Sequence, residues 1–348
     1  MYKIIIRRIL FLFPPEKVHR FAASFLRISL AIPLVASLVR KMYMVRHPLL
    51  ERTVFGLRFP NPVGIAAGFD KEAGLYNALS HFGFGHIEIG TVTPLGQPGN
   101  PQPRLFRLPK DKALINRMGF NNHGAQVVAE RIQKHKPGVI IGGNIGKNTA
   151  TPNEKAIDDY CSCFRVLFNH VDYFVINVSC PNIEGLSKLQ NKDELTALLE
   201  AIQLLNQAKD KPKPILLKIS PDLSDEQLDE VIDMVRATKL DGIIATNTTS
   251  KRDGLLTHPG KVESFGKGGL SGKPVWHKSV RAVSYLHNKT AGEIPIVAAG
   301  GIFTAEDAIN MLEAGATLVQ VYTGFVYEGP AIARRINKKI IAKANVTP

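Results

Sequence analysis

The sequence predicts an α/β protein, a (β/α)8 TIM barrel preceded by an N-terminal amphipathic helical arm. The first observation is eight short apolar runs, at Val63–Ala67, Ile87–Thr91, Val139–Ile145, Tyr173–Val178, Ile215–Ile219, Gly242–Thr246, Ile294–Ala298 and Leu318–Val321. The second is that segments with the apolar spacing of amphipathic helices separate most of these runs. No Gly-x-Gly-x-x-Gly opens a helix, which argues against a Rossmann domain. We therefore expect an arm at residues 1–50 and a barrel at residues 51–348.

The arm is predicted to form two short amphipathic helices that meet at Pro33. Residues 1–46 carry nine Lys or Arg against Glu16 alone, a net charge of +8 out of +14 for the chain. No apolar run reaches the ~18 residues of a spanning helix. A basic amphipathic pair suits an anionic membrane surface, which we expect residues 1–46 to bind. The alternative is that the two helices pack on the barrel of the same chain. Both interpretations hold if the two helices cover an apolar opening of the barrel.

Three capping signals predict where helices between the strands begin. They are Thr151-Pro152-x-Glu154, Ser224-x-x-Gln227 and Thr304-x-x-Asp307. Two connections are longer than ordinary barrel loops. The Pro- and Gly-rich stretch Thr93–Phe120 is expected to be functional. The stretch Lys251–Lys273 is expected to form either a mobile cover or a plain solvated loop.

The three cysteines, Cys161, Cys163 and Cys180, form no disulfide framework and indicate a reducing compartment. Cys161-x-Cys163 lacks the second pair of ligands that a zinc site needs, so we expect no metal site. Because arginine-rich runs with interleaved aromatic residues are absent outside the arm, we also expect no nucleic-acid partner.

Polar side chains follow the predicted strands, where barrel enzymes place their chemistry. The most unusual is Lys218, inside the apolar run Leu216–Ile219. A buried ammonium needs an anionic partner. A nearby acid could supply it, although this segment offers none before Asp222; a bound anionic cofactor is the other possibility. Gly300-Gly301 and Thr323-Gly324 follow the last two predicted strands. Many barrels bind phosphate at this position, so these residues also indicate a site for a cofactor phosphate.

The stretch Asn177-Val178-Ser179-Cys180-Pro181-Asn182 closes the fourth apolar run. Pro181 cannot donate to a sheet ladder, so the strand must end there with Cys180 in an extended backbone. Two amides and a thiol at a strand end suit a pocket that binds a flat polar ligand and moves a proton. Buried amides need partners, and a planar heterocycle with carbonyl and N–H groups would supply them.

These motifs resemble the dihydroorotate dehydrogenase family over nearly the whole chain. The motifs are Ala66–Lys71, Asn116–Phe120, Asn177–Asn182, Thr246–Thr248, Leu270–Gly272 and Gly300–Ile302. The basic arm and the stretch Asn100–Leu108 resemble class 2, whose members are membrane-associated and reduce a quinone. The resemblance implies oxidation of (S)-dihydroorotate to orotate through FMN in de novo pyrimidine biosynthesis, with electrons passed to a membrane quinone.

The resemblance also implies roles for individual residues. FMN would be held by Ala67, Gly68, Phe69, Asp70, Lys71, Thr91, Asn144, Asn177, Lys218, Thr246, Gly272, Gly301, Tyr322 and Thr323. Dihydroorotate or orotate would be held by Lys71, Asn116, Arg117, Met118, Gly119, Phe120, Asn177, Asn182, Asn247 and Thr248. Cys180 would be the catalytic base, and His19 and Arg107 would lie at the head of the quinone tunnel.

Cys180 departs from the class 2 pattern, in which this base is usually serine; the soluble class 1 enzymes carry cysteine. A free thiol ionises more readily than a hydroxyl, so the exchange leaves the role of base intact. The arm and Arg107 still favour a quinone as the acceptor. The alternatives are a class 1 enzyme that uses fumarate or NAD, an FMN-dependent tRNA dihydrouridine synthase, and a non-catalytic phosphate-binding barrel docked on membranes.

We expect the protein to be a monomer and a peripheral membrane protein. Because the chain has no transit-like leader, we expect it on the cytoplasmic face of a bacterial cell membrane. The mitochondrial inner membrane is the second choice.

Overall fold

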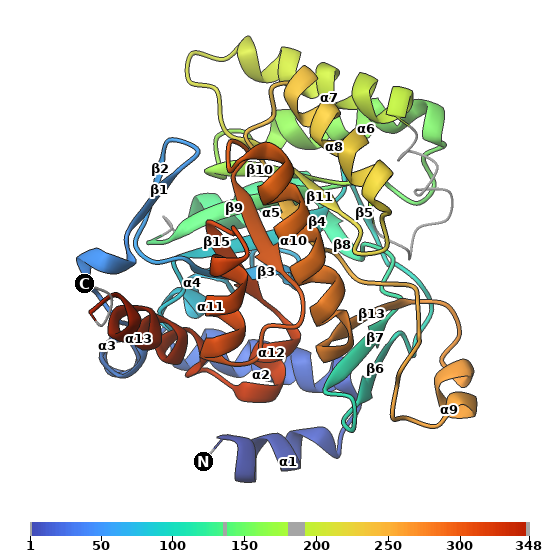
Figure 1. Cartoon of the computed structure of the whole chain (residues 1–348). Helices are drawn as coiled ribbons and strands as arrows, with labels where there is room; N and C mark the ends of the chain where they lie inside the picture. The colour runs from blue at the N-terminus through green and yellow to red at the C-terminus, as the bar shows by residue number, and fades with distance from the viewer. Residues whose placement is uncertain (1, 135–137, 180–191, 346–348) are drawn as a thin grey trace.

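A closed barrel of eight parallel strands forms the centre of the molecule, in the order β10-β11-β12-β14-β15-β3-β4-β9 (Figure 1). The computed structural model describes residues 2–134, 138–179 and 192–345. The strands are β3 (Val63–Asp70), β4 (His86–Val92), β9 (Ile140–Ile145), β10 (Tyr173–Asn177), β11 (Ile215–Ile219), β12 (Gly242–Ala245), β14 (Ile296–Ala299) and β15 (Leu318–Val321). Each matches one predicted apolar run, apart from small shifts at the ends, so the predicted barrel is confirmed.

Helices surround the barrel. They are α4 (Tyr76–Ser80), α5 (Ala125–Lys134), α6 (Ala156–Leu167), α7 (Lys192–Gln207), α8 (Asp225–Ala237), α10 (Trp276–Thr290), α11 (Ala305–Glu313), α12 (Thr323–Glu328) and α13 (Ile332–Ala344). The predicted capping boxes at Ser224 and Thr304 are both present. The predicted cap at Thr151 is wrong, because Pro152 occupies the N-cap position of a 3₁₀ turn, Asn153–Lys155, and α6 begins only after it.

Both long connections contain strands that meet beside the barrel. Thr93–Phe120 contains β5 (Leu95–Gln97), β6 (Leu105–Leu108) and β7 (Ala113–Asn116). The stretch Lys251–Lys273 is not a plain loop, since it contains α9 (Pro259–Ser264) and β13 (Gly269–Gly272). Strand β13 pairs antiparallel with β7, which also pairs with β6, while β5 pairs with β8 (Asn122–Gly124). The two connections therefore support each other.

The arm contains the two predicted helices, α2 (Pro15–Ser29) and α3 (Pro33–Tyr43). An unpredicted helical segment precedes them, with a π-helical turn at Tyr2–Ile6 and α1 (Arg7–Phe11). Two hydrogen bonds attach this segment to the C-terminal half of α12. The Tyr2 hydroxyl donates to Val326 O at 2.7 Å, and Arg7 Nη1 donates to Tyr327 O at 3.0 Å. Among the described helices, none alone is long and apolar enough to span a membrane; α2 and α3 meet that test only as a pair bent by 109°.

The two ends of the barrel differ in polarity. The short 3₁₀ turn Pro48–Leu50 leads into an antiparallel hairpin of β1 (Arg52–Val54) and β2 (Leu57–Phe59). Val54 and Phe59 of this hairpin join an apolar cluster with Tyr173, Leu216 and Ile244. This apolar cluster packs toward the amino-terminal end of the barrel, and the polar side chains of the candidate site lie toward the carboxyl ends of the strands.

Candidate active site

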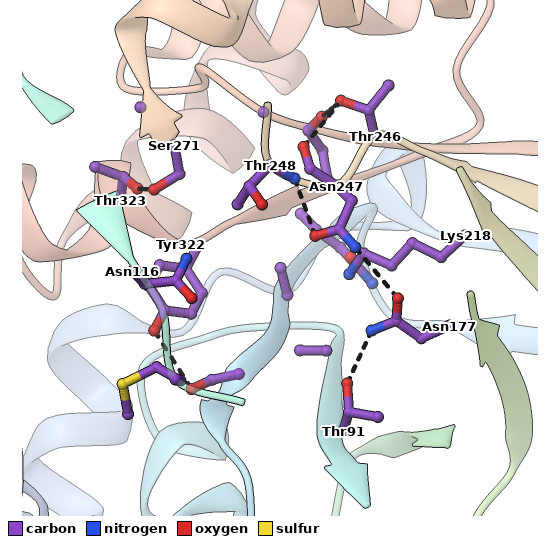
Figure 2. Close-up of a pocket in the computed structure, with 18 of the residues that line it drawn as sticks. Thr91, Asn116, Asn177, Lys218, Thr246, Asn247, Thr248, Ser271, Tyr322 and Thr323 are labelled. Atoms are coloured by element: carbon purple, nitrogen blue, oxygen red, sulfur yellow. Dashed lines mark hydrogen bonds between the residues drawn. The ribbon is translucent and has the colours of Figure 1, made fainter. Parts of the chain in front are cut away.

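A pocket lies at the carboxyl ends of the barrel strands (Figure 2). The predicted residues that line it are Ala67, Gly68, Lys71, Thr91, Asn116, Met118, Gly119, Phe120, Asn177, Lys218, Thr246, Asn247, Thr248, Gly272, Gly301, Tyr322 and Thr323. Its wall also contains Gly300 and Gly324, which were predicted to lie at a phosphate site, and five residues that were given no individual role: Ala66, Ser271, Ala299, Ile302 and Gln320. The pocket therefore draws on most of the barrel strands and on β7 and β13, while β9 contributes no residue to its wall.

A chain of hydrogen bonds connects the polar side chains on one side of the pocket. Asn247 Nδ2 donates to Asn177 Oδ1 at 3.2 Å, and Asn177 Nδ2 donates to Thr91 Oγ1 at 2.8 Å (Figure 2). Thr91 Oγ1 then donates to Asn144 Oδ1 at 2.5 Å. Asn144 is fully buried below the pocket, so it contacts a ligand only through Thr91 and Asn177.

Lys218 reaches the pocket from β11 and has an acidic partner that its own segment does not supply. Its Nζ lies 3.2 Å from Glu88 Oε1, a carboxylate on β4 with no exposed surface. The possibility of a nearby acid is thus realised, but the acid comes from across the barrel. Lys218 also lines the pocket, so its ammonium can still interact with an anionic ligand there.

Glycines allow the segments after β14 and β15 to pack closely against neighbouring parts of the chain. Gly300 and Gly301 have φ of +115° and +76°, a region that favours glycine. A Cβ on Gly301 would lie 2.7 Å from Trp276 Cα, and a Cβ on Gly324 would lie 1.9 Å from Ile302 O. Beside them, the hydroxyls of Ser271 and Thr323 hydrogen bond at 2.8 Å. Bare backbone N–H groups and hydroxyls are groups that suit a phosphate.

Several predicted site residues lie outside the pocket wall. The Asp70 carboxylate is buried and accepts backbone N–H bonds from Gly74, Leu75 and Tyr76 at 2.6–2.8 Å. Burial raises the pKa of this carboxyl, and those hydrogen bonds oppose the rise. Asp70 therefore shapes the loop that presents Lys71, whose ammonium donates to Asn121 Oδ1 at 2.5 Å.

The Arg117 side chain also lies outside the pocket wall, because its Nη2 donates to Pro103 O at 2.9 Å.

Cys180 and Asn182 lie outside the described residues. The chain is described up to Ser179, one residue before the thiol, and this residue is fixed in place. Its hydroxyl donates to Lys218 O at 2.8 Å and accepts from Asn247 Nδ2 at 3.0 Å.

His19 and Arg107 lie between the arm and the barrel. The His19 ring packs edge-on against Phe69 with centroids 5.2 Å apart, and Phe69 packs against Tyr322 at 5.6 Å. Burial lowers the pKa of His19, and the charge of Lys71 lowers it further. The Arg107 guanidinium lies 4.5 Å from the Phe11 ring centroid and donates to Leu10 O at 3.1 Å and to Phe13 O. Phe69 thus lies between the arm and the pocket.

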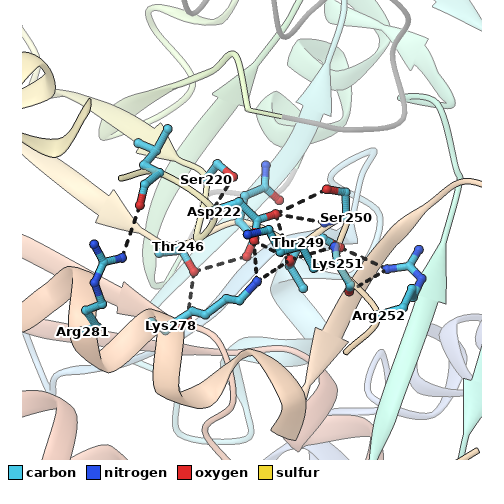
Figure 3. A network of polar contacts seen from close by, with 12 residues as sticks. Ser220, Asp222, Thr246, Thr249, Ser250, Lys251, Arg252, Lys278 and Arg281 are labelled. Carbon is cyan, nitrogen blue, oxygen red and sulfur yellow. Dashed lines mark hydrogen bonds and ion pairs between the residues drawn. The ribbon is translucent and has the colours of Figure 1, made fainter. Parts of the chain in front are cut away.

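A polar network around Asp222 holds the loop after β12 (Figure 3). The carboxylate accepts from Thr249 Oγ1 at 2.6 Å, from Ser250 N at 3.1 Å and from Lys278 Nζ at 2.6 Å. Burial raises the pKa of Asp222, but the hydrogen bonds from Lys278 and Thr249 outweigh it and leave the pKa below its usual value. Asp222 thereby fixes the segment that follows Asn247 and Thr248.

We expect Asp222→Asn to lose about 1–3 kcal/mol of stability at neutral pH, because it removes a charged acceptor of several hydrogen bonds. A depressed carboxyl pKa stabilises the fold above the unfolded-state pKa, and this contribution disappears as the pH falls through the folded-state pKa. Urea unfolding measures the free energy of unfolding of the wild type and of Asp222→Asn from pH 7 downward. The difference between the two free energies should be constant and should narrow only below about pH 4. The exposed Glu200 provides a control, Glu200→Gln. An unchanged difference at low pH would contradict the charge-based account.

No group of three or more His, Cys, Asp or Glu side chains able to hold a metal ion occurs in residues 2–134, 138–179 and 192–345. The geometry instead defines a class of protein: a (β/α)8 barrel with a polar ligand pocket, a buried cation and a glycine-lined wall at the carboxyl ends of its strands. A match to the family model of dihydroorotate dehydrogenase covers residues 49–343. The chain belongs to the dihydroorotate dehydrogenase family, as its motifs indicated.

Similar proteins carry the name of one class of this family. The chain is 55% identical over 343 residues to dihydroorotate dehydrogenase (quinone) of Christiangramia forsetii, covering 99% of each chain. It is 49% identical over 312 residues to the protein of that name from Thermosynechococcus vestitus, covering 88% of this chain and 85% of the other. The structure of the Eimeria tenella enzyme with ferulenol superimposes with a TM-score of 0.80 at 38% identity, covering 91% and 92% of the two chains. The assignment to class 2 is thereby confirmed.

Proposed function

We propose that this protein oxidises dihydroorotate to orotate through FMN and passes the electrons to a membrane quinone. The observation that carries the proposal is the convergence of three features on one pocket. These are the amide chain from Asn247 to Asn144, the Lys218 ammonium, and the glycine-lined wall at Gly301. The proteins of Christiangramia forsetii and Thermosynechococcus vestitus carry quinone in their name, and the arm beside the pocket would supply a place for one.

The pocket has the donor groups that FMN needs. The backbone at Gly301, the start of α12 at Thr323 and the neighbouring Ser271 would hold the phosphate. Lys218, Thr91 and Asn177 would hold the ring system, with Ala67, Gly68, Lys71, Thr246, Gly272 and Tyr322 around them. When bound, the flavin would supply the hydride chemistry. Phe69, Asp70 and Asn144 would act by supporting this wall, since their side chains lie behind it.

The substrate would lie over the amides at the outer part of the pocket. Asn116, Asn177, Asn247 and Thr248 can present donors and acceptors to a ring with carbonyl and N–H groups. Lys71 would add a positive charge for the carboxylate. Asn182 and the base Cys180 are proposed on their sequence motif alone. Cys180 would take a proton from C5 of the substrate while C6 gives up hydride.

The acceptor is tested by steady-state assays with dihydroorotate and different oxidants. We expect rapid turnover with a ubiquinone or menaquinone analogue and little with fumarate or NAD. His19 and Arg107 would bind the quinone head between the arm and Phe69. Turnover with fumarate or NAD but not with a quinone would overturn the assignment of a quinone as the electron acceptor. It would support the class 1 alternative that Cys180 suggests. No turnover with any acceptor would overturn the activity itself.

The arm is proposed to bind an anionic membrane surface and to bring the quinone to the barrel. Large apolar side chains are exposed along it, including Phe21 at 66%, Phe25 at 61%, Ile28 at 68% and Leu34 at 80%. Basic side chains occur among them, and such a surface binds lipid by combining apolar burial with charge. A monomer on the cytoplasmic face of a bacterial membrane remains our proposal for its state and location.

We expect Leu34→Asn to weaken binding to anionic phospholipid vesicles about tenfold, because burying a leucine in the membrane contributes about 1.5–3 kcal/mol. The measurement is co-sedimentation with vesicles that contain phosphatidylglycerol. Leu204 is exposed to 71% on α7, which lies far from the arm in Figure 1, so Leu204→Asn is the matched control and should bind as the wild type does. Equal weakening by both substitutions would contradict docking through the arm.

A further inference from the structure

The Glu88 carboxylate is fully buried inside the barrel and lies beneath the pocket without lining it. It projects from β4 between the apolar residues Ile87 and Ile89. Burying a carboxylate costs several kcal/mol unless charged or polar partners compensate. No step of the proposed reaction uses this side chain directly, so its position needs another explanation.

Three donors from three other strands converge on this carboxylate. Asn144 Nδ2 on β9 donates to Oε1 at 2.7 Å, and Lys218 Nζ on β11 donates to the same oxygen at 3.2 Å. Gln320 Nε2 on β15 donates to Oε2 at 2.7 Å. All three described partners are donors, so toward them Glu88 acts only as an acceptor. Its carboxylate lies within ion-pair distance of the Lys218 ammonium.

The carboxylate also sets the direction of the hydrogen bonds above it. Asn144 Nδ2 faces Glu88, so Asn144 Oδ1 is left to accept from Thr91. Thr91 Oγ1 then accepts from Asn177 Nδ2, and Asn177 Oδ1 accepts from Asn247. Every donor in this chain points toward Glu88. A single buried charge thus determines which atoms the pocket amides present, and such chains strengthen cooperatively.

We propose that Glu88 is a positioning residue that holds Lys218 as an ammonium under the pocket and orients the amide chain from Asn144 to Asn247. This inference rests on the proposed FMN site. It implies that Glu88 offsets part of the Lys218 charge felt by the flavin. Because reduction adds negative charge to a flavin, removing Glu88 while Lys218 stays protonated should favour the reduced form.

The test is the midpoint potential of the bound flavin, measured spectroelectrochemically from pH 5.5 to 9 in the holoenzymes. At the acidic end, Glu88→Gln should favour reduction about tenfold over the wild type, which equals about 30 mV for a two-electron couple. The difference should shrink as the pH rises, because an unpaired buried ammonium loses its proton more readily. Glu88→Asp keeps the charge and should show no such trend.

Two other titratable groups inside the barrel do not interfere. Burial lowers the pKa of His86 to about 3, and burial together with the Glu88 charge raises that of Tyr173 well above its usual value. Both stay neutral across the measured range.

A second variant separates the possible failures. Lys218→Met should lower the potential at every pH. If Lys218→Met lowers the midpoint potential while Glu88→Gln has the wild-type potential at every pH, the role assigned to Glu88 is overturned. If Lys218→Met has no effect either, it is the proposed flavin site that fails.

The pair can still be tested if Glu88→Gln does not yield folded protein. Breaking a buried ion pair by removing one partner is strongly destabilising, whereas replacing both partners often is not. The urea midpoint of the double variant Glu88→Gln/Lys218→Met should therefore exceed that of Lys218→Met. A double variant no more stable than the single one would overturn the pairing on which the inference depends.

Discussion

Replacing Cys180 with alanine is expected to slow the reduction of bound flavin by dihydroorotate about 10²–10⁴-fold, the usual contribution of a general base. The residue directly follows Ser179, whose hydroxyl is fixed between Asn247 and the Lys218 backbone at the pocket edge. No atom of the proposed flavin wall changes, so flavin should remain bound. Stopped-flow absorbance under anaerobic conditions measures the step directly.

Cys161→Ala is the matched control, because Cys161 is a buried thiol on α6 and does not line the pocket. We expect it to reduce flavin at the wild-type rate. Cys180→Ser should retain part of the activity with a pH profile moved to higher pH, since a hydroxyl ionises less readily than a thiol. Flavin reduction at the wild-type rate in Cys180→Ala would remove Cys180 from the mechanism.

The second large effect is expected from Gly324→Ala, which should weaken FMN binding by up to about 100-fold. A Cβ at this position would lie 1.9 Å from Ile302 O, a backbone atom that cannot turn away. The start of α12 must therefore move from the loop after β14, and overpacking of this kind costs about 1–3 kcal/mol or more. At 1.4 kcal/mol per tenfold, the upper end gives about 100-fold.

Fluorescence titration of flavin-free protein with FMN measures this loss. Gly74→Ala is the control, because a Cβ there would meet nothing within 4 Å and the position lies outside the pocket. It should bind FMN as the wild type does. If Gly324→Ala folds, with an unfolding midpoint near that of the wild type, and binds FMN normally, the glycine-lined wall is not the phosphate site.

Local patterns predicted most of the barrel. Apolar runs identified all eight strands, and two of three capping signals identified true helix starts. The segment Tyr2–Phe11 was missed because Arg7 and Arg8 interrupt its apolar pattern. Those residues form a helix on contacts from far along the chain, such as Arg7 with Tyr327. Long-range contacts of this kind leave no periodic signal in the sequence.

The site was predicted less completely. The strand ends supplied most of the pocket wall, but the partner of Lys218 could not be found within its own segment. Glu88 lies 130 positions away, and only closure of the barrel brings β4 and β11 to the same interior. One signal was present: a glutamate inside the apolar run Ile87–Thr91 is as unusual as the lysine in the fifth run. Two isolated opposite charges on buried strands predict a pair.

The central claim is that this pocket transfers hydride from dihydroorotate to FMN and then delivers the electrons to a quinone. The most direct measurement is the visible spectrum of the purified yellow protein under anaerobic conditions. Dihydroorotate should bleach the visible absorbance of the flavin, and a ubiquinone or menaquinone analogue added next should restore it. A flavin that stays oxidised with dihydroorotate, or a bleached flavin that no quinone reoxidises, would contradict the account.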